Sequence, residues 1–196
     1  MMETKIVGKV YVLGDNIDTD QIIPANYLTW DPSIPAERLK LGSKALDGLP
    51  DAIKARQPFM TPEQSEAIAA GTGKVDYPII IGGRGFGCGS SREHAPNALG
   101  AAGIQIVVAR GYARIFHENS VSTGELIPAT SLQDLVEHFE TGQQAEIDLA
   151  ANTISNLKTG NIFGIEPLGY ILPMVKAGGL FKYARQEGLI GERPSE

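Results

Sequence analysis

One glycine-rich segment limits the folds open to this chain more than any other feature. Five glycines stand within eight residues, from Gly82 to Gly89. The apolar run Tyr77–Ile81 precedes them, and a segment of helical character follows within 90–102. A short apolar run that ends in glycines is typical of a buried strand. The pattern therefore predicts a strand, a tight loop and a helix in succession, which is the repeating unit of α/β domains.

The rest of the chain predicts further elements of both kinds. Strands are expected over 5–13, 104–109, 124–127, 145–149, 153–156 and 161–165. Helices are expected over 112–120, over 132–140 with Ser131 and Asp134 as a capping pair, and over 170–187 with a break at Gly178-Gly179. Strands that alternate with helices and then form an antiparallel set predict one α/β domain over residues 1–196.

The segment 31–74 has a different texture, with prolines and glycines spread through it. Short helices are expected over 36–41, 51–56 and 62–70, the last with Thr61 as its N-cap. Because the apolar stripe of these helices is thin, we expect an inserted helical excursion rather than a second domain.

Composition excludes several classes of protein. The net charge is −6 and no basic run occurs, which argues against nucleic acid as the main partner. No stretch approaches about 18 consecutive apolar residues, so no membrane span is expected, and the N-terminus lacks the apolar region of a signal peptide. Cys88 is the single cysteine, which indicates a reducing compartment and is too few for an iron–sulfur cluster with the usual several thiolates.

The glycine-rich loop has the properties of an anion site. Glycines let the main chain approach a ligand, and a helix start supplies unpaired N–H groups. Three familiar patterns fail here. The dinucleotide pattern needs glycine where Ser90 stands, the nucleophile elbow needs glycine where Arg92 stands, and the loop has no lysine for a P-loop. We therefore expect this chain itself to bind no metal ion and no cofactor.

Two alternatives are open for the residues after the loop. Ser90 and Glu93 have the spacing of a capping box, whereas Pro96 favours a later helix start that leaves the Ser90 hydroxyl and the Arg92 guanidinium free for a carboxylate. Cys88 is either a nucleophile with His94 as base or, as we favour, a small thiol packed in a tight loop.

The run from Gly85 to Pro96, Gly-Phe-Gly-Cys-Gly-Ser-Ser-Arg-Glu-His-Ala-Pro, resembles the signature of the swivelling domain of the aconitase superfamily. Within that superfamily it is similar to the small subunits of 3-isopropylmalate dehydratases (isopropylmalate isomerases). Further segments that support the resemblance are 14–25, 112–116 and 177–180. The resemblance implies a β/β/α swivelling domain. It also implies that the partner is a large subunit, which carries a four-iron–four-sulfur cluster.

The resemblance also implies an activity and roles for single residues. A hydroxyl of a malate derivative moves between adjacent carbons by dehydration and rehydration, a step of leucine biosynthesis. Ser90 would be the catalytic base. Ser91 and Arg92 would bind a carboxylate of the dicarboxylate substrate, beside Gly87 and Gly89.

Substrate choice is implied to lie with Thr29 and Trp30. Relatives that act on tricarboxylates place an arginine at the position of Thr29, and its absence here favours an apolar isopropyl group. The alternative is that Trp30 only packs under the insertion.

Rival functions are a related dehydratase, for homoaconitate, citraconate or dimethylmalate, and a stand-alone anion-binding module. The expected location is the cytoplasm, or the plastid stroma for a plant protein.

Overall fold

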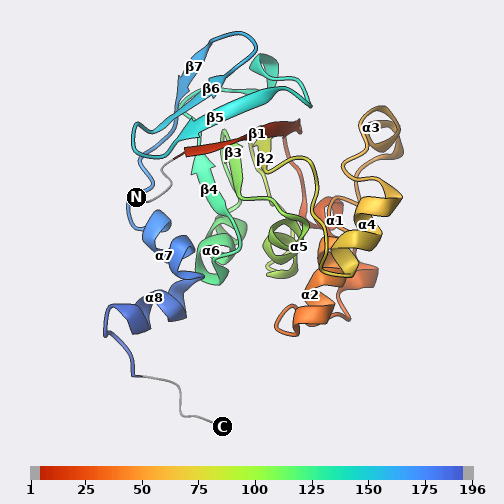
Figure 1. The fold of residues 1–196 in the computed structure, drawn as a ribbon, viewed down its shortest axis with the longest axis vertical. Coiled ribbons are helices and arrows are strands. Elements are labelled where there is room, and N and C mark those ends of the chain that lie inside the picture. Colours follow the sequence, from red (N-terminus) through yellow and green to blue (C-terminus); the bar gives the residue numbers. More distant parts are fainter. Residues whose placement is uncertain (1–4, 192–196) are drawn as a thin grey trace.

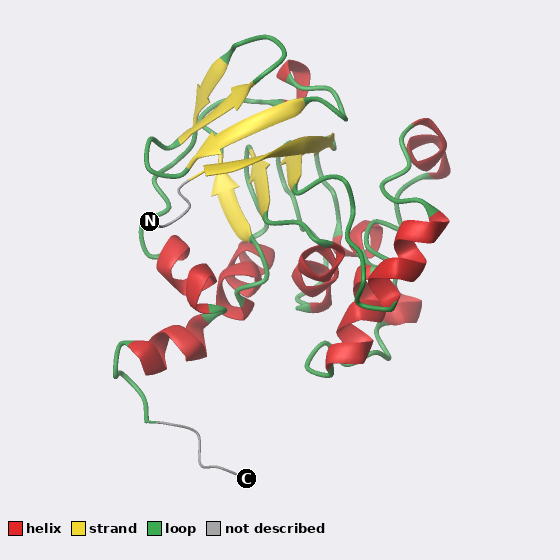
Figure 2. Cartoon of the chain, in the orientation of Figure 1, coloured by secondary structure: helices red, strands yellow, loops and turns green. Residues whose placement is uncertain are grey.

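The computed structural model describes residues 5–191 and has strands and helices in alternation (Figures 1 and 2). The strands are β1 (Lys5–Val12), β2 (Ile79–Gly82), β3 (Ile106–Ala109), β4 (Ile127–Thr130), β5 (Gln144–Asp148), β6 (Thr153–Asn156) and β7 (Ile162–Gly164). The α-helices are α1 (Thr19–Ile22), α2 (Pro35–Gly42), α3 (Asp51–Arg56), α4 (Pro62–Ala69), α5 (His94–Ala102), α6 (Arg114–Thr123), α7 (Ile171–Ala177) and α8 (Leu180–Gln186). Two short 3-10 helices are η1 (Ala25–Tyr27) and η2 (Val136–His138). Within residues 5–191, no helix has the length and apolar content that crossing a membrane requires.

All seven strands belong to one sheet, in the order β4-β3-β2-β1-β5-β6-β7. The strand β1 joins two different halves of it. Its last residues pair in parallel with β2, with Val10 opposite Ile79. Its first residues pair antiparallel with β5, with Lys5 opposite Asp148. The expected α/β class is therefore confirmed, with a parallel half that includes β1–β4 and an antiparallel half that includes β5–β7.

The sheet curls until its two outer strands meet. Ser131, directly after β4, forms an isolated antiparallel bridge with Ile165, directly after β7. On either side of that bridge, Leu132 N donates to Gly164 O at 3.0 Å and Glu166 N donates to Thr130 O at 2.8 Å. Figure 1 shows the antiparallel strands folded over the end of the parallel ones, with the helices gathered on the opposite side.

Two apolar cores lie on opposite faces of the parallel strands because successive strand side chains alternate in direction. Ile79 and Ile81 are packed with the antiparallel half, whereas Ile80 is packed with the helices. Leu41 and Ile68 from the segment 31–74 are fully buried in the same cluster as Ile80. This segment is thus tied more firmly to the domain than its thin apolar stripe suggested, and Arg38 of α2 also pairs with Glu125 across the helices.

Two expectations about individual elements are wrong, and one helix had no expectation. The helix expected over 132–140 is only the 3-10 turn η2, where Asp134 accepts from Val136 N instead of joining Ser131 in a cap. The strand expected over 124–127 lies at Ile127–Thr130, because α6 continues to Thr123 and Gly124 ends it in the left-handed conformation. The helix α1 was not expected. By contrast, the break at Gly178-Gly179 and the Thr61 cap are confirmed.

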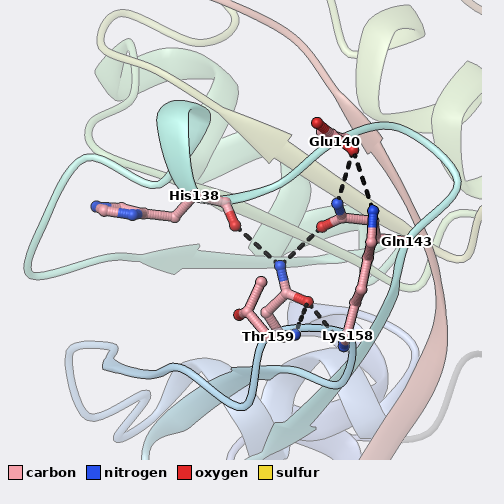
Figure 3. Close-up of polar contacts among 6 residues, drawn as sticks. His138, Glu140, Gln143, Lys158 and Thr159 are labelled. Carbon is pink, nitrogen blue, oxygen red and sulfur yellow. Dashed lines mark hydrogen bonds and ion pairs between the residues drawn. The ribbon is translucent and has the colours of Figure 1, made fainter.

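A buried amide holds the antiparallel half together (Figure 3). Asn156 is fully buried and donates to His138 O at 2.9 Å and to Gln143 Oε1 at 2.7 Å. Its own oxygen accepts from the N–H groups of Lys158 and Thr159. All four hydrogen-bonding positions of this amide are filled, so one side chain joins the end of η2, the start of β5 and the turn after β6.

Candidate functional site

The parallel strands bring three loops to one edge of the sheet. The loops 13–18, 83–93 and 110–113 follow β1, β2 and β3, and the carboxyl ends of neighbouring parallel strands share an edge. The glycine-rich loop 83–93 is the central one of the three. Crevices at this edge are the usual ligand sites of α/β sheets.

The loop 13–18 holds the glycine-rich loop along its length. Gly83 N donates to Gly14 O at 3.1 Å, and Gly87 N donates to Ile17 O at 2.7 Å. In the opposite direction, Thr19 N donates to Cys88 O at 2.8 Å. The two loops therefore lie side by side like a short ladder.

On its other side the loop packs against the start of α6. Phe86 N donates to Gly111 O, and the buried Phe86 ring lies edge-on to the Phe116 ring with centroids 5.4 Å apart. Gly87 has φ +77°, and a Cβ there would collide with the Phe116 ring. Gly87 is therefore required both by its backbone conformation and by the close approach of loop and helix.

These contacts restrict where an anion can bind. The N–H groups of residues 83, 84, 86, 87, 88 and 90 already donate to acceptors within the chain. The N–H groups of Gly85, Gly89, Ser91, Arg92 and Glu93 have no acceptor among the described residues. Four of these five belong to 89–93, so most of the N–H groups open to a carboxylate lie directly before α5.

The segment 89–92 is held by side chains of other elements. Ser90 N donates to Thr19 Oγ1 at 3.0 Å, and Asn119 Nδ2 donates to Ser91 O at 3.0 Å. Arg92 Nη1 donates to Asp20 Oδ1 at 2.8 Å. The Ser90 hydroxyl takes part in no hydrogen bond among the described residues. The serine therefore presents an unengaged oxygen, and two residues further along the chain Arg92 is held by the carboxylate of Asp20.

The helix α5 begins at His94, so Ser90 and Glu93 form no capping box. Pro96 is the third helical residue, where a main-chain N–H would have no partner within the helix. This arrangement is the later helix start that Pro96 favoured.

An open hollow of about 480 Å³ lies beside Ser90. It is lined by Gly87, Gly89, Ser90, Ala113, Arg114, Ile115 and Glu118. The exposed Arg114 and Glu118 form an ion pair at 2.8 Å, while Ile115 leaves an apolar side chain 45% exposed. The hollow combines an oxygen, an apolar wall and a charged edge, which suits a small molecule with a carboxylate and an alkyl group.

Thr29 and Trp30 differ in their surroundings. Thr29 is exposed, whereas Trp30 is half-buried and stacks on Tyr27 with ring centroids 5.3 Å apart. His94 Nε2 lies 3.1 Å from Trp30 O, to which it donates. This contact ties the segment 27–30 to the first residue of α5. His94 thus holds Trp30 and forms no hydrogen bond with Cys88.

Sequence reasoning missed three residues of this site. Three side chains hold the segment 89–92, those of Thr19, Asp20 and Asn119. The first two belong to the polar run Asp18-Thr19-Asp20, which is the one sequence signal that could have pointed to them. Asn119 lies mid-helix, and no local pattern marks it. Among residues 5–191, no three His, Cys, Asp or Glu side chains lie close enough together to hold a metal ion.

Comparison with known proteins gives consistent results. Residues 60–133 match the aconitase C-terminal domain family. The chain is 50% identical over 185 residues to 3-isopropylmalate dehydratase small subunit 1 of Arabidopsis thaliana, covering 93% of this chain and 70% of that one. It is 38% identical to 3-isopropylmalate dehydratase small subunit 1 of Methanopyrus kandleri, covering 95% of this chain and 96% of the other.

A relative from Methanocaldococcus jannaschii named isopropylmalate/citramalate isomerase small subunit is 34% identical over 95% of this chain and 97% of its own. A crystal structure of 3-isopropylmalate dehydratase from M. jannaschii superposes with a TM-score of 0.72 and 32% identity, covering 94% of this chain and 96% of that one.

Proposed function

Because the chain belongs to the family of 3-isopropylmalate dehydratase small subunits, we propose that it works with a large subunit on isopropylmalate. The pair interconverts 2-isopropylmalate and 3-isopropylmalate through 2-isopropylmaleate, as a step of leucine biosynthesis. The observation that carries this proposal is the unengaged Ser90 hydroxyl at the edge of an open hollow, in the segment that also holds Arg92.

Ser90 acts as the base that removes a proton from the substrate carbon. A serine hydroxyl is too weak a base at neutral pH, so its alkoxide has to be stabilised by nearby positive charge and N–H groups. Arg92 supplies the positive charge. The N–H groups of Gly89 and Ser91 donate to no acceptor within residues 5–191, which leaves them available for this purpose.

Arg92 and Ser91 bind a substrate carboxylate. Arg92 is already paired with Asp20, whose side chain is 62% exposed against 30% for Arg92. A carboxylate that reaches Arg92 takes the place of Asp20 or shares the guanidinium with it, since the planar group offers several donors.

The large subunit completes the site. We place a four-iron–four-sulfur cluster there, because Cys88 alone cannot provide the thiolates that such a cluster needs. When bound, that cluster supplies Lewis acidity toward the hydroxyl that leaves. The single thiol also supports a reducing location, the cytoplasm or a plastid stroma.

The domain organisation is part of the same proposal. Residues 1–196 form one swivelling domain, with 31–74 as an insertion, and the burial of Leu41 and Ile68 in the shared core supports it.

Substrate choice within this class rests on the segment 27–30. The exposed Thr29 and the half-buried Trp30 offer no cation to a third carboxylate, which supports isopropylmalate over homoaconitate. Citramalate, which a relative's name mentions, is the closest second candidate. Citraconate and dimethylmalate belong in the same assay panel.

The test is Ser90→Ala in the assembled pair. We expect kcat to fall by at least a thousandfold, while the melting temperature and the association with the large subunit stay within error, since the hydroxyl makes no hydrogen bond with any of residues 5–191. Ser155→Ala, on the far strand β6, is the matched control and keeps full activity. An active Ser90→Ala enzyme would overturn the assignment of the base.

A further inference from the structure

We propose that Thr19 and Asn119 are positioning residues. They hold the segment 89–92, which we call the catalytic segment, from two sides. This inference rests on the proposed role of Ser90 and extends it to residues outside the glycine-rich loop. It begins from how the segment 89–92 is attached. In the part of the chain that the structure describes, no main-chain N–H or C=O of these four residues forms a hydrogen bond with another main-chain group.

The segment would otherwise be free to move. Gly89 has φ +100°, a conformation that glycine alone adopts easily, and α5 begins only at His94. A reacting group has to be held within a fraction of an ångström of its productive position for full catalysis. Its attachment to side chains of other elements therefore decides where the Ser90 oxygen points.

Thr19 is built as a fixed acceptor for the Ser90 N–H. It is only 2% exposed, and its own main chain is held at both ends, because its N–H donates to Cys88 O and its C=O accepts from Ile23 N. The helix that contains it has a complete capping box between Asp18 and Gln21. The hydroxyl oxygen that receives Ser90 N at 3.0 Å thus has little freedom.

Asn119 holds the other end of the serine pair. It lies on α6, and its Nδ2 donates to Ser91 O at 3.0 Å. The helix is fixed near this point by the buried Phe116, whose ring packs under Gly87. Thr19 and Asn119 therefore anchor the N–H of Ser90 and the C=O of Ser91, from α1 and α6.

The third contact is of a different kind. Asp20 holds the Arg92 side chain and not the main chain, and a substrate carboxylate takes its place or shares the guanidinium with it. The Thr19 and Asn119 contacts hold main-chain atoms and do not depend on that exchange.

The experiment uses the assembled enzyme and five variants of this chain: Thr19→Val, Thr19→Ser, Asn119→Ala, the double variant Thr19→Val with Asn119→Ala, and Thr141→Val. The last is the matched control, because Thr141 Oγ1 accepts a main-chain N–H from Val12 at 2.9 Å, the same bond type outside the site. We expect kcat to fall at least tenfold in Thr19→Val and in Asn119→Ala, with KM within threefold. Thr141→Val stays within twofold of wild-type kcat.

Two further results separate positioning from a general structural role. Thr19→Ser retains the acceptor and restores kcat to within threefold of the wild type. The double variant loses less than the product of the two single losses, because a segment released by one change has less to lose by the second. In the isolated full chain, the Ser90 amide exchanges its hydrogen at least tenfold faster in Thr19→Val and unchanged in Thr141→Val.

Equal kcat losses in Thr19→Val and Thr141→Val, no rescue by serine, or an unchanged exchange rate of the Ser90 amide would each overturn the proposal. Ser90→Ala is measured alongside. If Ser90→Ala is inactive while both anchor variants are as active as the wild type, only the positioning role fails. If Ser90→Ala is active, the proposed function fails first.

Discussion

The charge of Arg92 is already matched within the chain. The bond from its guanidinium to Asp20 keeps the side chain in place before any ligand arrives. In the proposed function, a dicarboxylate substrate therefore competes with a carboxylate of the protein, and part of its binding energy is offset by the weakening of that contact. The consequence is selectivity: a weak or monodentate anion gains little by displacing Asp20, whereas a well-oriented carboxylate gains a bidentate contact.

Thr29 carries a prediction about specificity. Thr29→Arg supplies a cation for a third carboxylate and places an uncompensated charge against an isopropyl group. Trp30, stacked on Tyr27, limits the space, so we expect the loss of isopropylmalate activity to exceed the gain on homoaconitate. The measurement is kcat/KM on both substrates with one large subunit. A constant ratio between the two substrates would show that Thr29 does not face the variable group.

His117 carries a prediction about pH. Burial lowers the pKa of this imidazole below its usual 6.5, and its ring lies edge-on to Tyr112. The unfolded chain therefore binds a proton more readily than the folded one. The contribution of His117 to stability is complete above pH 6.5 and is lost as the pH falls from there through the lower pKa of the folded protein. We expect urea unfolding to show a larger loss of stability from pH 8 to pH 5 in the wild type than in His117→Phe. Equal losses would contradict the prediction.

The sequence pointed to the segment 89–92, but not to the residues that hold it. The run from Gly85 to Pro96 proposes Ser90, Ser91 and Arg92 as site residues through its resemblance to a family signature, and their roles stay a prediction. Thr19 and Asn119 lie 71 and 28 residues away from their partners along the chain. The arrangement of the parallel strands brings these residues together, and the spacing of residues in the sequence does not reveal that arrangement.

At the scale of elements, local signals worked where they were complete. Thr61 with Gln64 and the pair Gly178-Gly179 mark helix boundaries chemically, and both are confirmed. The spacing of Leu135 and Phe139 is compatible with a helix, yet both are buried by the curled sheet around a short 3-10 turn. There the closure between Ser131 and Ile165 decides the conformation, and a local pattern cannot report it.

Asn156 provides the prediction for an element. Asn156→Ala removes four hydrogen bonds of a fully buried side chain, and the C=O of His138 and the N–H groups of Lys158 and Thr159 lose this partner. We expect a loss of about 2–4 kcal/mol in the free energy of unfolding, measured in urea. The exposed Asn161→Ala in the same turn is the control and changes stability by at most about 0.5 kcal/mol. A loss of that small size in Asn156→Ala would mean that the network of Figure 3 is not formed in solution.

At the scale of the whole molecule, the division of work between two subunits gives a direct expectation. The purified chain alone has no visible absorbance and no turnover on isopropylmalate, because Cys88 is its only thiol. Activity begins when the large subunit is added. Absorbance spectra, iron and sulfide analysis, and assays with and without the partner test this. Stoichiometric iron and sulfide in the chain alone would contradict the two-subunit arrangement.

Because β1 pairs with strands of both halves of the sheet, it sets the order in which the halves can form during synthesis on the ribosome. Lys5 pairs with Asp148, so the first strand waits for nearly 150 residues of synthesis before its antiparallel partner exists. Its parallel partner, Ile79, emerges midway. A nascent chain can thus assemble the parallel half of the sheet first, and β5 pairs with the free edge of β1 last. Truncation anywhere before β5 leaves that edge open to strand pairing with other chains.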